Sequence, residues 1–139
     1  MKRVIGIGGV FFKTKNPQHT REWYALHLGI VSDQYGATFE WRKADAPDKK
    51  GFTAWSPFAE STQYFQPSES ELMVNYRVEN LEALLEVLRT EGVQIVGDME
   101  VHDYGKFAWI LDPDGRKVEL WEANDDVFET ILQTVNPQV

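Results

Sequence analysis

The stretch Tyr104–Glu122, YGKFAWILDPDGRKVELWE, contains two apolar segments separated by a strong turn signal. In the turn sequence DPDG at 112–115, Pro113 presets the φ that its position needs and Gly115 accepts the positive φ that closes the loop. Apolar and polar residues alternate on both sides of this turn. We therefore predict two strands that fold back on each other as a β-hairpin.

Glu119 is the exception within the second of these strands. It lies between Val118 and Leu120, and the period of two in a strand places it on the same face as Trp121. Such a carboxylate is either solvated or faces a cavity in which its charge has a use.

The order of elements is repeated along the chain with an offset of 64 residues. Gly51 falls on Gly115 with this offset, and the helix-ending glycines Gly29 and Gly92 are 63 residues apart. The expected elements are strand Ile5–Lys13, a helix opened by Asn16-Pro17, strands Ala37–Lys43 and Gly51–Ser56, strand Leu72–Val78, helix Leu81–Arg89, and three further strands. We predict an α+β fold in which two βαβββ repeats form a curved mixed sheet with helices outside.

These repeats define the expected domain organisation. A single domain at 1–123 contains a first unit at about 4–56, a linker at 57–71 and a second unit at about 72–123, and residues 124–139 form a helical extension. Asp125 or Asp126 can cap this helix, and Pro137 follows its end. Its apolar stripe consists of Val127, Phe128, Ile131, Leu132 and Val135. The stripe packs either on its own domain or on a twofold partner.

The hairpin string GKFAWILDPDGRKVELWE resembles the C-terminal hairpin of the vicinal oxygen chelate superfamily, which includes glyoxalase I, bleomycin-resistance and fosfomycin-resistance proteins, and extradiol dioxygenases. The pattern Trp23-Tyr24-x4-Gly29 is similar to the aromatic pair and closing glycine of that superfamily. The resemblance covers roughly residues 4–123. It implies that chemistry takes place in a cavity between the two repeats, and that a homodimer is expected.

The resemblance also implies where a metal would bind, because superfamily enzymes take ligands from the first and last strand of each unit. The corresponding positions here are Gly9, Trp55, Met73 and Glu119. Only Glu119 is an oxygen ligand, whereas a divalent catalytic site needs about three protein ligands of N or O type. His19 and His102 lie in polar, loop-like sequence away from these strands. We therefore predict no metal cofactor, with a divalent metal as the alternative.

The residues at and near these positions suggest a ligand-binding cavity. Strand alternation directs an aromatic and thioether set with two polar members toward it: Phe11, Trp41, Trp55, Met73, Asn75, Trp109, Glu119 and Trp121. These side chains either line a pocket or close the core.

Three functional classes fit this set of residues. The first is a bleomycin-resistance-like protein that binds a small aromatic or cationic molecule without metal. The second is a glyoxalase-like lyase or isomerase, or a dioxygenase, that has an atypical metal site or uses Glu119 as a general base. The third is a structural or regulatory dimer.

Composition excludes several other classes of function. The net charge of −8, with 14 basic residues scattered among 22 acidic ones, argues against binding to nucleic acid. The absence of cysteine excludes disulfides and thiolate chemistry. No apolar run has the length of a membrane span and no signal peptide is recognisable, so we expect no membrane association and a cytoplasmic location.

Overall fold

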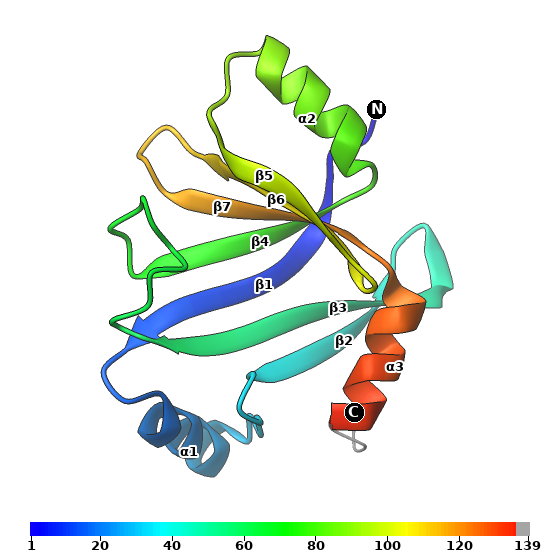
Figure 1. Cartoon of the computed structure of the whole chain (residues 1–139). Helices are drawn as coiled ribbons and strands as arrows, with labels where there is room; N and C mark the ends of the chain where they lie inside the picture. Colours follow the sequence, from blue (N-terminus) through cyan, green and yellow to red (C-terminus); the bar gives the residue numbers. More distant parts are fainter. Residues whose placement is uncertain (136–139) are drawn as a thin grey trace.

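The computed structural model describes residues 1–135, which form one seven-stranded mixed sheet with three helices outside it, as Figure 1 shows. The strand order is β2-β3-β1-β4-β7-β6-β5. The elements are β1 (Val4–Thr14), α1 (Pro17–Leu28), β2 (Ala37–Lys43), β3 (Ala46–Ala59), β4 (Leu72–Val78), α2 (Leu81–Thr90), β5 (Ile95–His102), β6 (Gly105–Leu111), β7 (Lys117–Ala123) and α3 (Asp125–Val135). The predicted fold class is confirmed.

The two repeats meet at the antiparallel pair β1 and β4 in the middle of the sheet. Gly9 pairs with Asn75 and Phe11 pairs with Met73, on either side of the Val10–Val74 pair. A local twofold axis through that pair exchanges Gly9 with Met73 and Phe11 with Asn75, which is the predicted offset of 64 residues. Each central strand then runs parallel to the last strand of its own repeat, β1 beside β3 and β4 beside β7.

The first repeat has two strands after its helix, whereas the second has three. The segment after Gly29 is too short for a further strand because Asp33 and Gly36 already form a turn with one isolated bridge. β3 begins at Ala46, since Lys43 pairs directly with Ala46 across a tight turn. Residues 46–50, which lie before the strand that we expected at Gly51–Ser56, therefore belong to β3.

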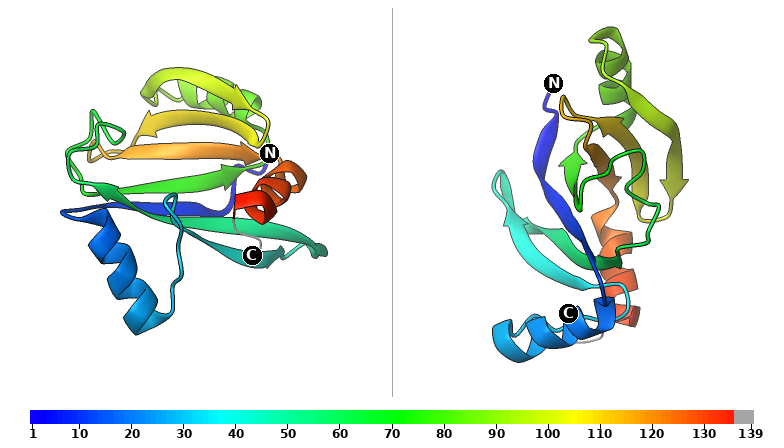
Figure 2. Two further views of the ribbon diagram at one scale, coloured as in Figure 1. Left: turned by 60° about the horizontal axis from the view of Figure 1, so that its bottom comes forward. Right: turned by 90° about the vertical axis from the view of Figure 1, so that its left-hand side faces the viewer.

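The helices differ in how they pack against the sheet. α2 buries Leu81, Leu84, Leu85 and Leu88 in a core under β6 and β7, whereas α1 has no buried residue. In the left view of Figure 2, α1 projects away from the sheet instead of lying along it. None of the described helices is long and apolar enough to cross a membrane.

α3 packs on its own chain. The ring of Phe128 meets Phe52 and Trp121 edge-on, with ring centroids 5.6 and 5.0 Å apart. The apolar stripe of this helix is thus partly covered within the chain, which is one of the two arrangements that the sequence left open. The predicted position of Pro137 after the helix and the side chain of Val135 lie outside what the structure describes.

The glycines of β1 allow side chains of β4 to lie across that strand. A Cβ at Gly8 would be 2.1 Å from Asn75 Oδ1 and 2.9 Å from Arg77 Cγ, which no real side chain could tolerate. We call the face of the sheet that carries Met73, Asn75, Arg77 and Glu119 the inner face. Glycine in β1 therefore brings the polar groups of β4 into the centre of the inner face.

Candidate functional site

Glu119 lies at the centre of the inner face, and its side chain is 3% exposed. Asn75, its partner in the β4–β7 ladder, donates from Nδ2 to Oε1 at 2.6 Å. Trp109, its partner in the β6–β7 ladder, donates from Nε1 to Oε2 at 2.9 Å, and the Tyr64 hydroxyl also donates to Oε2. A buried carboxylate is tolerated only when such donors replace its water shell.

Tyr64 comes from the segment 60–71, between the repeats, and occupies an aromatic slot above Glu119. Its ring stacks on Phe58 with centroids 5.8 Å apart and planes 4° apart, and it meets Trp109 edge-on at 6.4 Å. Burial, followed by the negative charge of Glu119, raises the pKa of the Tyr64 hydroxyl far above its ordinary value. The side chain is still 38% exposed, so one edge of the slot opens to solvent.

The base of the slot is closed by apolar side chains. Phe65, the neighbour of Tyr64, is 0% exposed and packs with Met73 and Trp109. Phe11 joins them and meets Phe58 with centroids 5.7 Å apart. We expected a linker at 57–71, but residues 57–59 belong to β3, and the segment 60–71 supplies side chains that fill the predicted cavity.

Lys117 forms one wall of the same slot. Its Nζ lies 5.3 Å from the ring centre of Tyr64 and 5.5 Å from that of Trp109, and it donates to the Tyr64 carbonyl at 2.8 Å. Burial lowers the pKa of Lys117, although the charge of Glu119 acts in the opposite direction. The slot thus holds a carboxylate at one end and an ammonium group beside the ring.

A second polar cluster lies further along the inner face, around Arg77. The guanidinium is 2% exposed and lies between the rings of Trp41 and Trp121, 5.2 and 5.1 Å from their centres. It donates to the Phe52 carbonyl at 3.4 Å and to the carboxylate of Asp125 at the start of α3. This Arg77 cluster connects α3 to the sheet.

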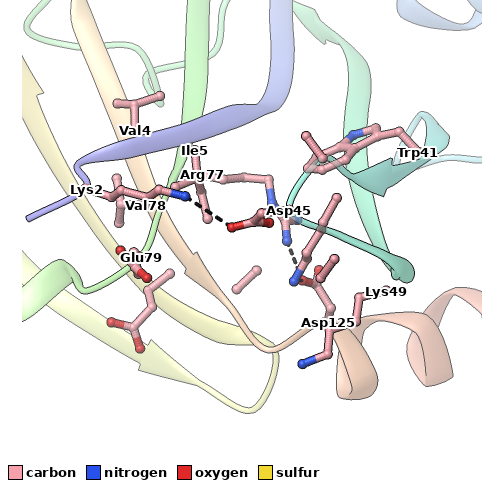
Figure 3. Close-up of a pocket in the computed structure, with 15 residues that line it drawn as sticks. Lys2, Val4, Ile5, Trp41, Asp45, Lys49, Arg77, Val78, Glu79 and Asp125 are labelled. Atoms are coloured by element: carbon pink, nitrogen blue, oxygen red, sulfur yellow. Dashed lines mark hydrogen bonds and ion pairs between the residues drawn. The ribbon is translucent and has the colours of Figure 1, made fainter.

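A cavity of about 610 Å³ adjoins the Arg77 cluster, between the N-terminal residues of β1, the β2–β3 turn and the start of α3. Figure 3 shows Arg77 and Asp125 joined on one side of it and Lys2 joined to Asp45 on another. Lys43 Nζ also lies 2.9 Å from Asp125. Charges of both signs therefore line this cavity and largely pair with one another.

The predicted site residues separate into three groups. Met73, Asn75, Trp109 and Glu119 gather around the slot, with Phe11 beside them. Trp41 and Trp121 belong to the Arg77 cluster. Trp55 lies on the opposite face of the sheet, where its ring packs against Phe12 of β1 and Tyr24 of α1.

The predicted position of Trp55 in the cavity is therefore wrong, and the reason is register. Ser56 pairs with Phe11 in the β1–β3 ladder as Glu119 pairs with Asn75 in the β4–β7 ladder. Ser56, one residue further along, is thus the structural equivalent of Glu119. A shift of one residue moves a side chain to the other face of a sheet.

The side chains do not fit the divalent metal site of the superfamily. Gly9 offers no ligand, and Met73 is packed against aromatic rings. Ser56, which takes the place of Trp55 as the counterpart of Glu119, donates its hydroxyl to the Tyr35 carbonyl at 2.8 Å. Both oxygens of Glu119 already accept hydrogen bonds from protein groups. Within residues 1–135, no three histidine, aspartate or glutamate side chains gather closely enough to hold an ion.

The sheet topology has close counterparts among solved structures. Methylmalonyl-CoA epimerase from Mycobacterium tuberculosis has a TM-score of 0.58 at 19% identity, over 93% of this chain and 95% of its own. A Streptomyces coelicolor methylmalonyl-CoA epimerase in complex with 2-nitronate-propionyl-CoA has a TM-score of 0.63 at 12% identity, over 87% of this chain and 99% of its own. The protein has the vicinal oxygen chelate fold.

A third counterpart shows that the same fold occurs within a longer chain. The Mn(II)-bound glyoxalase from Novosphingobium aromaticivorans has a TM-score of 0.56 at 18% identity, over 88% of this chain but only 40% of its own. No protein-family model and no curated protein matches the sequence. At these identities the likeness concerns the fold alone, so function must be argued from the site.

Proposed function

We propose that the protein binds a small hydroxyaromatic molecule, without a metal ion, in the slot that Tyr64 occupies. One observation carries this proposal: the phenol of Tyr64 is seated like a ligand, with its ring on Phe58 and its hydroxyl on Glu119. An external phenol can make the same contacts when Tyr64 rotates out. Apolar area then supplies affinity, and the buried carboxylate fixes orientation.

The charges around the slot select among possible ligands. Glu119 accepts a hydrogen bond from a phenol and would also attract a cation, but Lys117 Nζ lies 5.3 Å from the ring centre of Tyr64 and repels positive charge there. A neutral aromatic hydroxyl satisfies Glu119 without this repulsion. Among the aromatic and cationic ligands that the sequence suggested, the site thus favours the neutral aromatic class.

Access to the slot depends on Tyr64 and Phe65, which are neighbours in sequence but differ in burial. Phe65 is fully buried and anchors the segment 60–71, whereas Tyr64 is 38% exposed. Rotation about the side-chain torsions of Tyr64 can therefore free the slot while Phe65 stays in place. Binding competes with an intramolecular contact, so the affinity of the wild type is reduced by the fraction of molecules in which Tyr64 is out.

The test compares p-cresol, which copies the Tyr64 side chain, with toluene and 4-methylbenzylamine. We expect saturable p-cresol binding to the wild type by calorimetry, and roughly tenfold tighter binding to Tyr64→Ala because the competing phenol is gone. Bound p-cresol should raise the melting temperature of Tyr64→Ala, since it binds only the folded state. Toluene and the amine should bind more weakly to both proteins.

Two controls make the outcome specific. Tyr35→Ala removes another exposed tyrosine, 69% exposed and outside the slot, and should bind p-cresol like the wild type. Glu119→Gln should weaken p-cresol binding but not toluene binding. Absence of saturable p-cresol binding in both the wild type and Tyr64→Ala contradicts the proposal, as does stoichiometric metal in the wild type that is lost in Glu119→Gln.

A further inference from the structure

Tyr64 is held at both of its ends, and a simple phenol reproduces only one of these two contacts. Its hydroxyl donates to Glu119, and its main-chain carbonyl accepts a hydrogen bond of 2.8 Å from Lys117 Nζ. Between these contacts its ring stacks on Phe58. The intramolecular occupant of the slot therefore presents a phenol at one end and a carbonyl oxygen at the other.

The two side chains that hold Tyr64 come from one strand. Lys117 and Glu119 are two residues apart in β7, so their side chains leave the same face of the sheet about 6.6 Å apart. A benzene ring with a short substituent para to its hydroxyl spans this interval. A ligand that lies along β7 with its hydroxyl at Glu119 thus carries its para substituent toward Lys117.

Lys117 has hydrogen-bond donors to spare for a ligand. Its ammonium group carries three N–H donors, and within residues 1–135 its protein acceptor is the Tyr64 carbonyl. The side chain is half-buried beside the rings of Tyr64 and Trp109. Burial lowers the pKa of Lys117, because the charged group has lost part of its water shell. An acceptor on a bound ligand would replace a partner that burial has removed.

The charges around Lys117 distinguish an uncharged acceptor from an anionic one. Glu119 and Glu100 both act on Lys117 through their negative charge. A carboxylate on the ligand would be repelled by these charges, whereas an uncharged carbonyl accepts the hydrogen bond without that repulsion. We propose that the slot selects 4-hydroxyaryl compounds that carry an uncharged carbonyl group close to the para position, as in amides, esters and ketones. The carbonyl requirement rests on the proposed function, because the phenol must first occupy the slot.

Calorimetry with two phenols of matched shape tests the proposal. 4-Hydroxyphenylacetamide carries the carbonyl, and 4-isobutylphenol has two methyl groups in place of the amide oxygen and nitrogen. Both are titrated into Tyr64→Ala, which keeps the carbonyl of residue 64, and into the double variant Tyr64→Ala/Lys117→Met. Loss of Lys117 should weaken amide binding roughly tenfold, because a charged hydrogen-bond donor is removed, and should change 4-isobutylphenol binding by less than about twofold.

Two further variants separate the role of Lys117 from general effects on the fold. Tyr64→Ala/Lys117→Arg retains a charged donor and should keep most of the amide affinity. Tyr64→Ala/Lys13→Met is the matched control, because Lys13 Nζ also lies near an aromatic ring of the segment 60–71, 5.4 Å from the centre of Phe65. This control should bind the amide like Tyr64→Ala. Melting temperatures verify that each variant is folded.

The possible outcomes separate this proposal from the proposed function. 4-Hydroxyphenylacetate has the shape of the amide and a negative charge, and it should bind Tyr64→Ala more weakly than the amide does. Tighter binding of this carboxylate overturns the choice of an uncharged carbonyl. If Lys117→Met changes amide and 4-isobutylphenol binding equally while p-cresol still binds, the carbonyl requirement is wrong and the proposed function stands. If Tyr64→Ala binds none of these phenols, both proposals are wrong.

Discussion

Tyr64 donates its phenolic hydrogen to Glu119, which lies 55 positions later in the chain. The contact joins the segment between the repeats to the last strand of the second repeat. It adds a third donor to the two that come from the neighbouring strands, Asn75 and Trp109. The same hydrogen bond therefore contributes to stability and, in the proposed function, must break before a ligand reaches the carboxylate.

Replacing Tyr64 with Phe should change how stability depends on alkaline pH. Burial and then Glu119 raise the pKa of Tyr64 in the folded protein above its ordinary value of 10.0. A group whose pKa is raised on folding contributes stability that is fully present below its unfolded pKa and is lost as the pH rises above it. The free energy of unfolding of Tyr64→Phe should be about 1 kcal/mol lower than that of the wild type at neutral pH. Above pH 10 it should decline less than that of the wild type, because the variant lacks the titrating hydroxyl. Urea unfolding from pH 7 to 11 measures both effects, and parallel curves for the two proteins would contradict the prediction.

A second carboxylate beside Glu119 should be tolerated only in acid. Asn75 is 1% exposed and its Nδ2 lies 2.6 Å from Glu119 Oε1. Asn75→Asp replaces this donor by a second negative charge beside Glu119. We therefore expect the free energy of unfolding to fall by about 3–5 kcal/mol at neutral pH. Protonation removes the repulsion between two adjacent carboxylates, so the loss should shrink as the pH is lowered. Asn75→Ala lacks the added charge and should show a loss that does not vary with pH in this way.

The ion pair between Arg77 and Asp125 predicts an effect of acid on the attachment of α3. Burial raises the pKa of Asp125, but hydrogen bonds from Arg77 and Lys43 outweigh it and hold this pKa below its ordinary value of 3.8. Because the pKa is depressed, the stabilisation is present above the unfolded pKa and is lost as the pH falls through the folded one. We expect Asp125→Asn to cost about 1–2 kcal/mol at pH 7, and the difference from the wild type to shrink below about pH 4.

Tryptophan fluorescence during urea unfolding is a suitable probe for this experiment, because Trp41 and Trp121 flank Arg77. The exposed neighbour Asp126 provides the control, since it lies in the same first turn of α3. Asp126→Asn should change stability by a few tenths of a kcal/mol only. If the two substitutions lowered the free energy of unfolding equally, the cause would be the lost charge at the start of α3 and not the lost ion pair with Arg77.

Much of the fold could be predicted because its signals are local or repeated. The turn at 112–115 forms as expected: Gly115 has a φ of 80°, and Asp112 Oδ1 accepts from the backbone of Asp114 and Arg116 at 2.9 Å. Asn16 caps α1 through its side chain, and Gly29 ends that helix with a φ of 68°. Such features depend on a few neighbouring residues, and the duplication then specifies how β1 and β4 meet.

The site was less predictable because it depends on register and on contacts distant in sequence. Trp55 was assigned to the wrong face through an error of one position, because the offset between the repeats is 64 residues at β1 and β4 but 63 at β3 and β7, where Ser56 corresponds to Glu119. Tyr64 and Phe65 lie in a segment rich in Ser, Gln and Pro, where composition indicates only a loop. Two adjacent aromatic residues in such a segment were the available signal that it packs against the core.

The position of Trp55 leads to a final prediction, in which stability and ligand binding separate. Its ring meets Phe12 and Tyr24 with centroids 5.3 and 4.9 Å away, and together these three side chains hold α1 against the sheet. Trp55→Ala removes that contact, so we expect a loss of about 2–4 kcal/mol, below the full range for a core tryptophan because Trp55 is only half-buried. The p-cresol affinity of the folded variant should equal that of the wild type, since the slot lies on the other face. Urea unfolding and calorimetry on one preparation measure the two quantities, and weaker p-cresol binding at unchanged stability would place Trp55 in the binding site instead.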